Sequence, residues 1–229
     1  SDVYKRQGRY VEAAEQFSLV AEIDSENMVA LGNMGASYML AGDFESAAPA
    51  YERAIELEPR AVTYSNLGLM YYYLERFDDA ADALRSGIEI APSNHAMWMN
   101  LGDVLSAADR VDASREAFGK AGELASAGLE VNANDATLKM DLAWIRAMLG
   151  ERDAALRLIA EAAQGLPDDP YVDYIHGLIL NREADTDEAI TAFESAIDKG
   201  YPRVLLAAEP HLQNLHEDLR FVALVEPGA

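Results

Sequence analysis

Cysteine is absent from this chain of 229 residues, which excludes disulfide bonds, thiolate metal sites and thiol catalysis. Histidine is scarce, and its spacing matches no metal-binding motif such as HExxH. The sequence also lacks a glycine-rich phosphate loop and a nucleophile elbow. It therefore predicts a protein that is not an enzyme and that uses no metal and no cofactor. The four histidines are His95, His176, His211 and His216.

Basic residues are few as well. The chain has 18 Lys and Arg against 40 Asp and Glu, and its net charge is −22. A field of that sign repels phosphate backbones and no basic cluster offsets it, so we expect no nucleic-acid partner. Two interpretations of the acidity stay open. It serves solubility or a salty habitat, or it steers basic partners toward the protein.

Long apolar runs are also missing. No stretch approaches the roughly 18 residues that cross a bilayer, so we expect no membrane insertion and a cytoplasmic location. The first seven residues, SDVYKRQ, resemble the translated adapter junctions that end some environmental sequence fragments. If these residues are not native, natural N-terminal sequence is missing, and the lack of a signal peptide carries little weight.

What the sequence does contain is a ladder of small residues that repeats about every 34 positions. Four glycines each precede a second small residue by twelve positions, a large residue by sixteen and a third small residue by nineteen. The four sets are Gly35, Ala47, Tyr51 and Ala54; Gly68, Ala80, Leu84 and Gly87; Gly102, Ser114, Phe118 and Ala121; and Gly177, Ala189, Phe193 and Ala196. Prolines recur where a repeat would end, at Pro59, Pro92 and Pro167.

This pattern resembles the tetratricopeptide (TPR) repeat, a pair of antiparallel helices that stacks on its neighbours. The resemblance implies an all-α fold, a right-handed α-solenoid of TPR helix pairs with a C-terminal capping segment. Small residues at the ladder positions let the two helices approach closely, while larger side chains fill the remaining space. We expect a partial first repeat over 1–27, five full units over 28–60, 61–94, 95–135, 136–169 and 170–202, and a cap over 203–229.

Three of the full units depart from the pattern. Unit 95–135 has seven extra residues, 122–128, and seven residues turn a helix by about two full revolutions. A second helix extended by roughly 10 Å explains them, and a hinge at the local glycines is the alternative. In the last two units Lys139 and Asp173 stand where an aromatic residue is usual, so we expect these units to pack less well.

The tail after residue 202 is no repeat, but it carries many apolar residues between Val204 and Val225. A terminal repeat exposes an apolar face, which a capping helix usually covers. The string GYPRVLLAAEPHLQNLHEDLRFVALV resembles tails that close TPR modules in bacterial multidomain signalling proteins. Those modules are often joined to cyclase, protein kinase or winged-helix DNA-binding domains.

In the TPR family the first helices of the pairs line a concave surface. One inward position reads Asn33, Asn66, Asn100 and Asp141 in consecutive units. Asparagine offers both a donor and an acceptor, so a row of asparagines can hold the backbone amides of an extended peptide. Several TPR proteins use such a ladder. The alternative is that asparagine is simply frequent at this position in the family.

The rest of the predicted groove is apolar and aromatic, with Asp103 adding negative charge. Methionine surfaces adapt to varied partners, and Tyr and Trp are favoured binding anchors. Some of these side chains would instead pack between repeats, so we expect about half of them to be accessible. Besides Asp103 and the row of amides, the candidate peptide-binding residues are Met39, Tyr72, Tyr73, Met99, Met140, Trp144, Tyr171 and Tyr174.

One known TPR mechanism is disfavoured. The carboxylate clamp that grips acidic chaperone tails needs Lys or Arg at inward positions, and none is present. At one of these positions the five units carry Val29, Val62, Ala96, Thr137 and Tyr171. At another they carry Gly32, Ser65, Met99, Met140 and Tyr174. Paired acids do not suggest catalysis either, because they fall at expected helix starts and complement the helix dipole there. These acids are Asp78 and Asp79, Asp168 and Asp169, and Asp185 and Asp187.

These features predict a protein–protein interaction scaffold that binds a peptide or helix, apolar to basic in character, in its concave groove. The second interpretation is a regulatory region of a larger bacterial signalling enzyme or transcription factor of cyclase, kinase or winged-helix type. Secretion or envelope assembly is a third, and an enzyme acting alone is a fourth. Sequence upstream of residue 1 would distinguish them.

Overall fold

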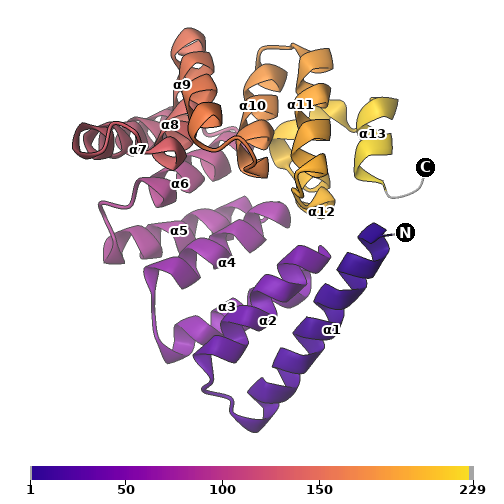
Figure 1. Ribbon diagram of the computed structural model, residues 1–229. Helices are drawn as coiled ribbons and strands as arrows, with labels where there is room; N and C mark the ends of the chain where they lie inside the picture. The colour runs from indigo at the N-terminus through magenta and orange to yellow at the C-terminus, as the bar shows by residue number, and fades with distance from the viewer. Residues whose placement is uncertain (1, 227–229) are drawn as a thin grey trace.

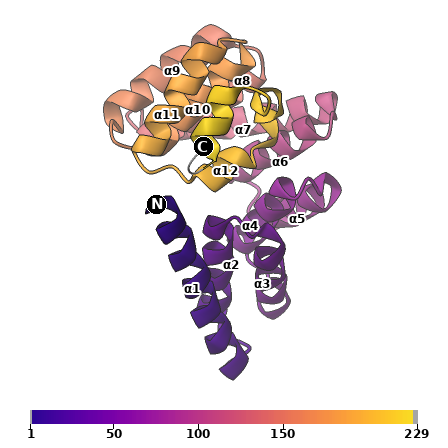
Figure 2. The same cartoon turned by 90° about the vertical axis from the view of Figure 1, so that its right-hand side faces the viewer.

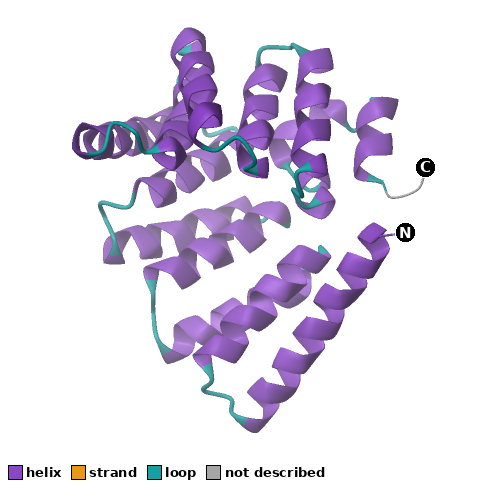
Figure 3. Cartoon of the chain, in the orientation of Figure 1, coloured by secondary structure: helices purple, strands orange, loops and turns teal. Residues whose placement is uncertain are grey.

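The computed structural model describes residues 2–226, and their side chains from residue 9 onward. Every regular element in this part of the chain is a helix, as Figure 3 shows. The predicted all-α class is therefore confirmed. Residues 1 and 227–229 lie outside the described part, as do the side chains of the start suspected to be non-native.

Ten consecutive helices form antiparallel pairs, preceded by one long helix, α1 (Asp2–Ile23). The pairs are α2 (Met28–Ala41) with α3 (Phe44–Leu57), α4 (Ala61–Tyr73) with α5 (Phe77–Ile90), α6 (His95–Ala107) with α7 (Val111–Val131), α8 (Ala136–Met148) with α9 (Arg152–Gly165), and α10 (Pro170–Arg182) with α11 (Thr186–Asp198). Three short elements follow, α12 (Arg203–Ala207), the 3-10 helix η1 (Pro210–Leu215) and α13 (Leu219–Val225).

Local sequence explains where these helices begin and end. Asn27, Asp135 and Asp169 each accept a hydrogen bond from a backbone N–H in the first turn of the following helix. Within each pair the chain turns through a left-handed residue, which favours glycine. Gly42 (φ 81°) and Gly150 (φ 82°) fill that position in two pairs. The other pairs place Glu75, Asp109 and Ala184 there, at φ 55°, 56° and 63°.

Within a pair, glycine lets a large side chain of the second helix lie against the backbone of the first. A Cβ atom at Gly35 would lie 2.6 Å from the ring of Tyr51, and one at Gly102 would lie 2.8 Å from that of Phe118. The same contact recurs between Gly68 and Leu84 and between Gly177 and Phe193. The large partners are almost fully buried, so the ladder in the sequence marks the line of closest approach between the helices.

The last two pairs replace the usual aromatic contact by charged contacts. Lys139 of α8 lies 2.7 Å from Glu161 of α9. In the next pair, Asp173 of α10 lies 2.7 Å from Lys199 and accepts a hydrogen bond of 2.6 Å from Ser195 of α11. These contacts join the two helices of each pair at the positions where the sequence departs from the repeat pattern.

Helix α7 is unbroken over 21 residues, against 14 in α5, so the seven inserted residues are helical. The extended-helix interpretation is confirmed, and no hinge divides this pair. Two glycines of the extension lie close to α8. A Cβ at Gly122 would lie 3.3 Å from Ile145, and one at Gly128 would lie 2.6 Å from Leu138. These glycines allow the extension to pack on the next pair.

The pairs follow a curved path that brings the two ends of the chain near each other in both views (Figures 1 and 2). Direct contacts between α4 and α6 and between α8 and α10 show that the first helices of successive pairs lie together along one side. The C-terminal elements, yellow in Figure 1, turn back toward the first pairs, and α12 contacts α2.

We expect Gly102→Ala to lower the melting temperature, because its methyl group would lie within 3.0 Å of the buried Phe118 ring. The cost should be about 1–3 kcal/mol. Gly119→Ala in α7 is the control, since nothing lies within 4 Å of that position. Removing a helical glycine there should stabilise the protein by about 0.5–1 kcal/mol. Urea titrations followed by circular dichroism compare the two, and equal stabilities would contradict the close-approach argument.

Candidate functional site

The first helices of the pairs, α2, α4, α6, α8 and α10, line the inner face on which the sequence places the groove. In the structure this face is partly filled by the chain itself. Residues 203–216, comprising α12, the turn at Glu209 and η1, cross it from α10 toward α2 (Figure 2). We call residues 203–216 the internal segment.

Glu209 is the centre of the internal segment's contacts and is only 4% exposed. Its Oε1 accepts hydrogen bonds from the Tyr72 hydroxyl of α4 at 2.5 Å and from the backbone N–H of His211 at 3.2 Å. Its Oε2 accepts one from the Tyr174 hydroxyl of α10 at 2.7 Å. Burial and the nearby carboxylate raise the pKa of both tyrosines well above 10, so both hydroxyls remain protonated and donate.

His211 extends these contacts to α6 and α8. Its Nε2 lies 3.4 Å from Oδ1 of Asp103, an oxygen that also accepts the Trp144 indole N–H at 2.8 Å. The His211 nitrogen has no aligned hydrogen bond among the described residues, so this is a close approach between an imidazole and a carboxylate. Burial alone would lower the pKa of His211, but Asp103 and Glu209 raise it above its usual value. Burial also raises the pKa of Asp103, against the opposing effect of His211.

Amide side chains of the internal segment also form hydrogen bonds with α10 and with Glu75, which lies between α4 and α5. Asn181 of α10 and Asn214 exchange hydrogen bonds of 3.1 and 2.9 Å between their side-chain amides. Gln213 donates to Glu75, just beyond α4, at 3.3 Å. The internal segment therefore bridges the second and fifth pairs of the solenoid across the inner face.

Four predicted groove residues, Tyr72, Asp103, Trp144 and Tyr174, are brought together by the fold and lie beneath the internal segment. The three aromatic side chains are buried. The sequence predicts them as anchors for a partner, and in the structure they contact the chain's own C-terminal residues. Met140 is also buried in the core.

Other predicted residues lie around the covered region. Tyr73 stacks on Phe44 with ring centroids 4.8 Å apart. Met39 and Met99 are half-buried and pack against the core. Tyr171 is 46% exposed and offers the largest open aromatic surface among the predicted residues.

The predicted row of amides divides into two parts. Asn100 donates to a serine hydroxyl of α4 at 3.4 Å, and Asp141 lies 2.8 Å from Nε2 of His95. These two side chains therefore join neighbouring inner helices. Asn33 is exposed and Asn66 is half-buried, and neither side chain makes a hydrogen bond within residues 9–226. Of the row, Asn33 and Asn66 are thus the residues left available to a ligand.

An open pocket of about 170 Å³ lies beside Asn66, between the α2–α3 pair and the start of α4. Its rim carries Val29 and Val62, which are 72% and 62% exposed. Arg60 stands at the same rim, where it forms an ion pair of 2.6 Å with Glu58. The pocket is therefore mainly apolar, with one amide on its wall.

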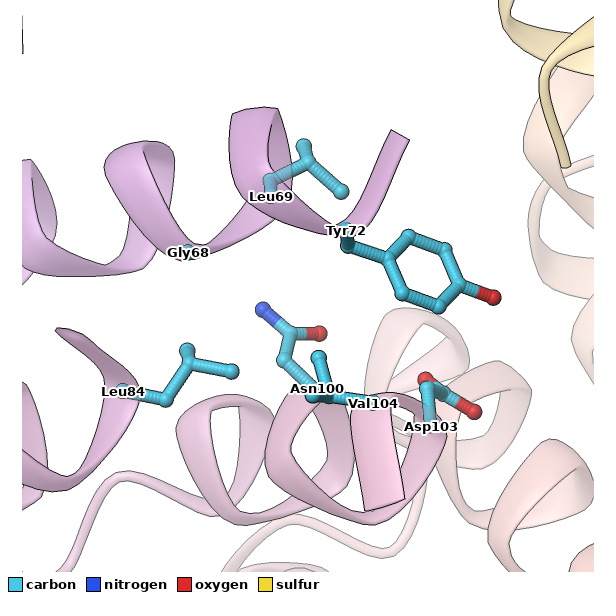
Figure 4. A pocket seen from close by; sticks show the side chains of 7 residues that line it. All are labelled: Gly68, Leu69, Tyr72, Leu84, Asn100, Asp103 and Val104. Atoms are coloured by element: carbon cyan, nitrogen blue, oxygen red, sulfur yellow. The ribbon is translucent and has the colours of Figure 1, made fainter. Parts of the chain in front are cut away.

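A smaller cavity of about 30 Å³ separates α4 from α6 (Figure 4). Gly68 lies on one wall and Asn100 and Val104 on the other, while Tyr72 and Asp103 lie at one end. The volume admits about one water molecule, so we interpret it as a gap between pairs and not as a ligand pocket.

The sequence analysis missed Glu209 and His211, which hold the internal segment in place. Both belong to the tail that was interpreted only as a cap. One signal was present: a carboxylate in a leucine-rich run, LLAAEPHLQNL, needs partners if the run is buried. Val29 and Val62 were predicted only to lack the charge of a carboxylate clamp, and their exposure as apolar surface was not predicted.

Among the described side chains, those of residues 9–226, no three His, Asp or Glu groups lie close enough together to hold a metal ion. Over the same residues, no helix combines the length and the apolar character needed to span a bilayer. The inner face offers apolar surface, amides and hydroxyls, which are groups suited to binding.

Comparison with protein families matches residues 26–93 and 65–128 to tetratricopeptide repeat models. These matches span residues 26–128, and the same helix pairs continue to residue 198. The fold is a TPR solenoid. The matched residues stop short of the C-terminal tail, so the resemblance of that tail to bacterial signalling proteins is not confirmed. A comparison with curated proteins finds no match.

Solved structures show the same fold. TTC0263, a thermophilic TPR protein of Thermus thermophilus, is 19% identical with a TM-score of 0.59 over 81% of this chain and 98% of its own. A chain of the APC/C hetero-tetramer Cut9–Hcn1 is 19% identical with a TM-score of 0.59 over 95% of this chain and 39% of its own. YrrB, described as a TPR protein with an unusual peptide-binding site, is 23% identical with a TM-score of 0.46 over 86% and 98%. At these identities the likeness concerns the fold alone.

The two partly buried histidines predict opposite pH dependences of stability. The pKa of His211 is raised above 6.5, so its stabilising contribution is complete below pH 6.5 and is lost as the pH rises through the folded pKa. The pKa of His176 is lowered by burial, so stability falls as the pH drops below 6.5.

We therefore expect the melting-temperature difference between the wild type and His211→Gln to shrink from about pH 6 to about pH 8.5. The melting temperature of the wild type relative to that of His176→Gln should instead fall as the pH drops below 6.5. Differential scanning fluorimetry of the three proteins measures both trends. Parallel pH profiles for all three would show that the His211 contact contributes nothing.

Proposed function

We propose that this TPR solenoid is a protein–protein interaction scaffold that holds a peptide or helix against the open part of its inner face. The observation that carries the proposal is the open apolar pocket beside Asn66. The amide of Asn66 lies on the wall of the pocket, and the exposed amide of Asn33 occupies the equivalent position on the preceding pair.

The open part follows the starts of the inner helices. Val29, Val62 and Tyr171 are the second residues of α2, α4 and α10, and all three are exposed. Large apolar side chains exposed at equivalent positions favour burial against a partner. The internal segment covers positions farther along the helices, such as Tyr72 and Asp103, and leaves these starts free.

The chemistry of the pocket indicates what a partner segment would offer. An apolar side chain would enter the pocket, and its own backbone amide would lie beside Asn66. Because an amide side chain donates and accepts, this contact does not depend on the sequence of the ligand. Arg60 at the rim is paired with Glu58, helices α2 and α4 contain no Lys or Arg, and the net charge is −22, so we expect neutral or basic segments to be favoured over acidic ones.

A ligand for the test comes from selecting a peptide-display library on the immobilised protein. We expect Asn66→Ala to weaken binding of the selected peptide about five- to tenfold, since one hydrogen bond contributes about 1–1.4 kcal/mol. Asn134→Ala is the matched control, because Asn134 is exposed outside the inner face. Isothermal titration calorimetry should give the control the wild-type affinity.

Val62→Glu tests the apolar half of the pocket. Val62 is exposed, so the substitution should leave the fold intact while placing a charge at the rim. We expect loss of at least tenfold in affinity for the selected peptide. If neither Val62→Glu nor Asn66→Ala weakens binding, the pocket is not the ligand site.

A further inference from the structure

The internal segment lies on the inner face as a ligand would. Its polar and aromatic contacts reach four inner helices, α4 through Tyr72, α6 through Asp103, α8 through Trp144 and α10 through Tyr174. Its two short helices are separated by the turn at Glu209 and do not form a repeat of their own. The contacts are therefore those of a peptide in a groove and not those between stacked pairs.

Covering the end of the solenoid is the task of a different element. Phe221 of α13 is buried against Phe193 of α11, with ring centroids 6.3 Å apart. Arg220 lies 2.6 Å from Asp187 at the start of α11. Although η1 also contacts α10 of this pair, the contacts of the internal segment with α4, α6 and α8 are not needed to cover the end of the solenoid.

The contacts define what the covered site recognises. A carboxylate, that of Glu209, accepts hydrogen bonds from two tyrosine hydroxyls on different pairs. Two residues later, the imidazole of His211 meets the Asp103 carboxylate. Leu206 and Leu212, both fully buried, fill the apolar surface on either side. The site therefore matches a bent segment with the pattern Leu-x-x-Glu-x-His-Leu, in which an extended Glu separates two short helices.

We propose that Tyr72, Asp103, Trp144 and Tyr174 form a second peptide-binding site, which the chain's own residues 203–216 occupy. The site takes a leucine-flanked acidic turn, so its charge preference is opposite to that of the pocket beside Asn66. A partner segment with the same pattern competes with the internal segment. Because a short tether gives an effective concentration on the order of millimolar, only a tightly binding or concentrated partner displaces it.

The test supplies the segment as a separate peptide. A fluorescent peptide of residues 203–218 is titrated into the full 229-residue chain carrying Leu212→Asp, which places a charge at a fully buried position and expels the internal segment. We expect this variant to bind the peptide at least tenfold more tightly than the wild type, whose site is filled. The same peptide with Glu209→Ala should bind the variant at least tenfold more weakly, since it lacks the acceptor for both tyrosines.

Two further measurements distinguish release of the internal segment from unfolding of the whole protein. Hydrogen exchange of residues 203–216 shows whether the internal segment has left, and circular dichroism shows whether the helix pairs remain. If Leu212→Asp unfolds the protein, Glu209→Ala in the full chain is the milder opened variant. Adding Asn66→Ala should leave peptide binding unchanged, which separates this site from the open pocket.

Three results would overturn the proposal. An opened variant with an exposed internal segment could fail to bind the peptide. The peptide with Glu209→Ala could bind as tightly as the original. Residues 203–216 could stay protected in both opened variants, which would make the internal segment a fixed part of the core.

Discussion

Close contact between a glycine of one helix and a large side chain of the next determines the shape of this protein. Gly35 with Tyr51 and Gly102 with Phe118 bring the two helices of their pairs together at the same relative position. Because the contact recurs from pair to pair, successive pairs stack similarly and their first helices stay on one side. That side is the inner face, and the binding properties of the protein follow from which of its side chains stay open.

The chemistry of the inner face changes along its helices. At their starts, Val29 and Val62 are exposed near the amide of Asn66, without a cation on α2 or α4. Farther along, the hydroxyls of Tyr72 and Tyr174 converge on one carboxylate. The two proposals assign apolar to basic segments to the first region and an acidic turn to the second.

Burial of Glu209 shows how an acidic chain places a charge in its interior. A carboxylate moved out of water loses hydration, and hydrogen-bond donors must replace it. Two tyrosine hydroxyls and one backbone N–H do so here, without a lysine or arginine. The nearby Asp103 adds repulsion, and both carboxylates raise the pKa of His211 against the effect of burial.

Much of the fold could be predicted because its main contacts are local and periodic. The small residues that recur about every 34 positions mark contacts within one pair, and the extra turns of α7 follow from seven added residues. The sequence did not show which side chains of the amide row form hydrogen bonds within the protein. Asn100 and Asp141 bond to neighbouring helices, while Asn66 does not, although all three share one position of the repeat.

The sequence by itself determined the helix pairs, their order and the side that faces inward, since each of these depends on residues within one repeat or the next. Only the tertiary structure decided which part of the inner face is open. Glu209 meets Tyr72 from 137 positions away, and no periodic pattern encodes such a contact. This contact forms because the stacked pairs follow a curved path. The path brings residues 203–216 back to the second pair, α4 with α5.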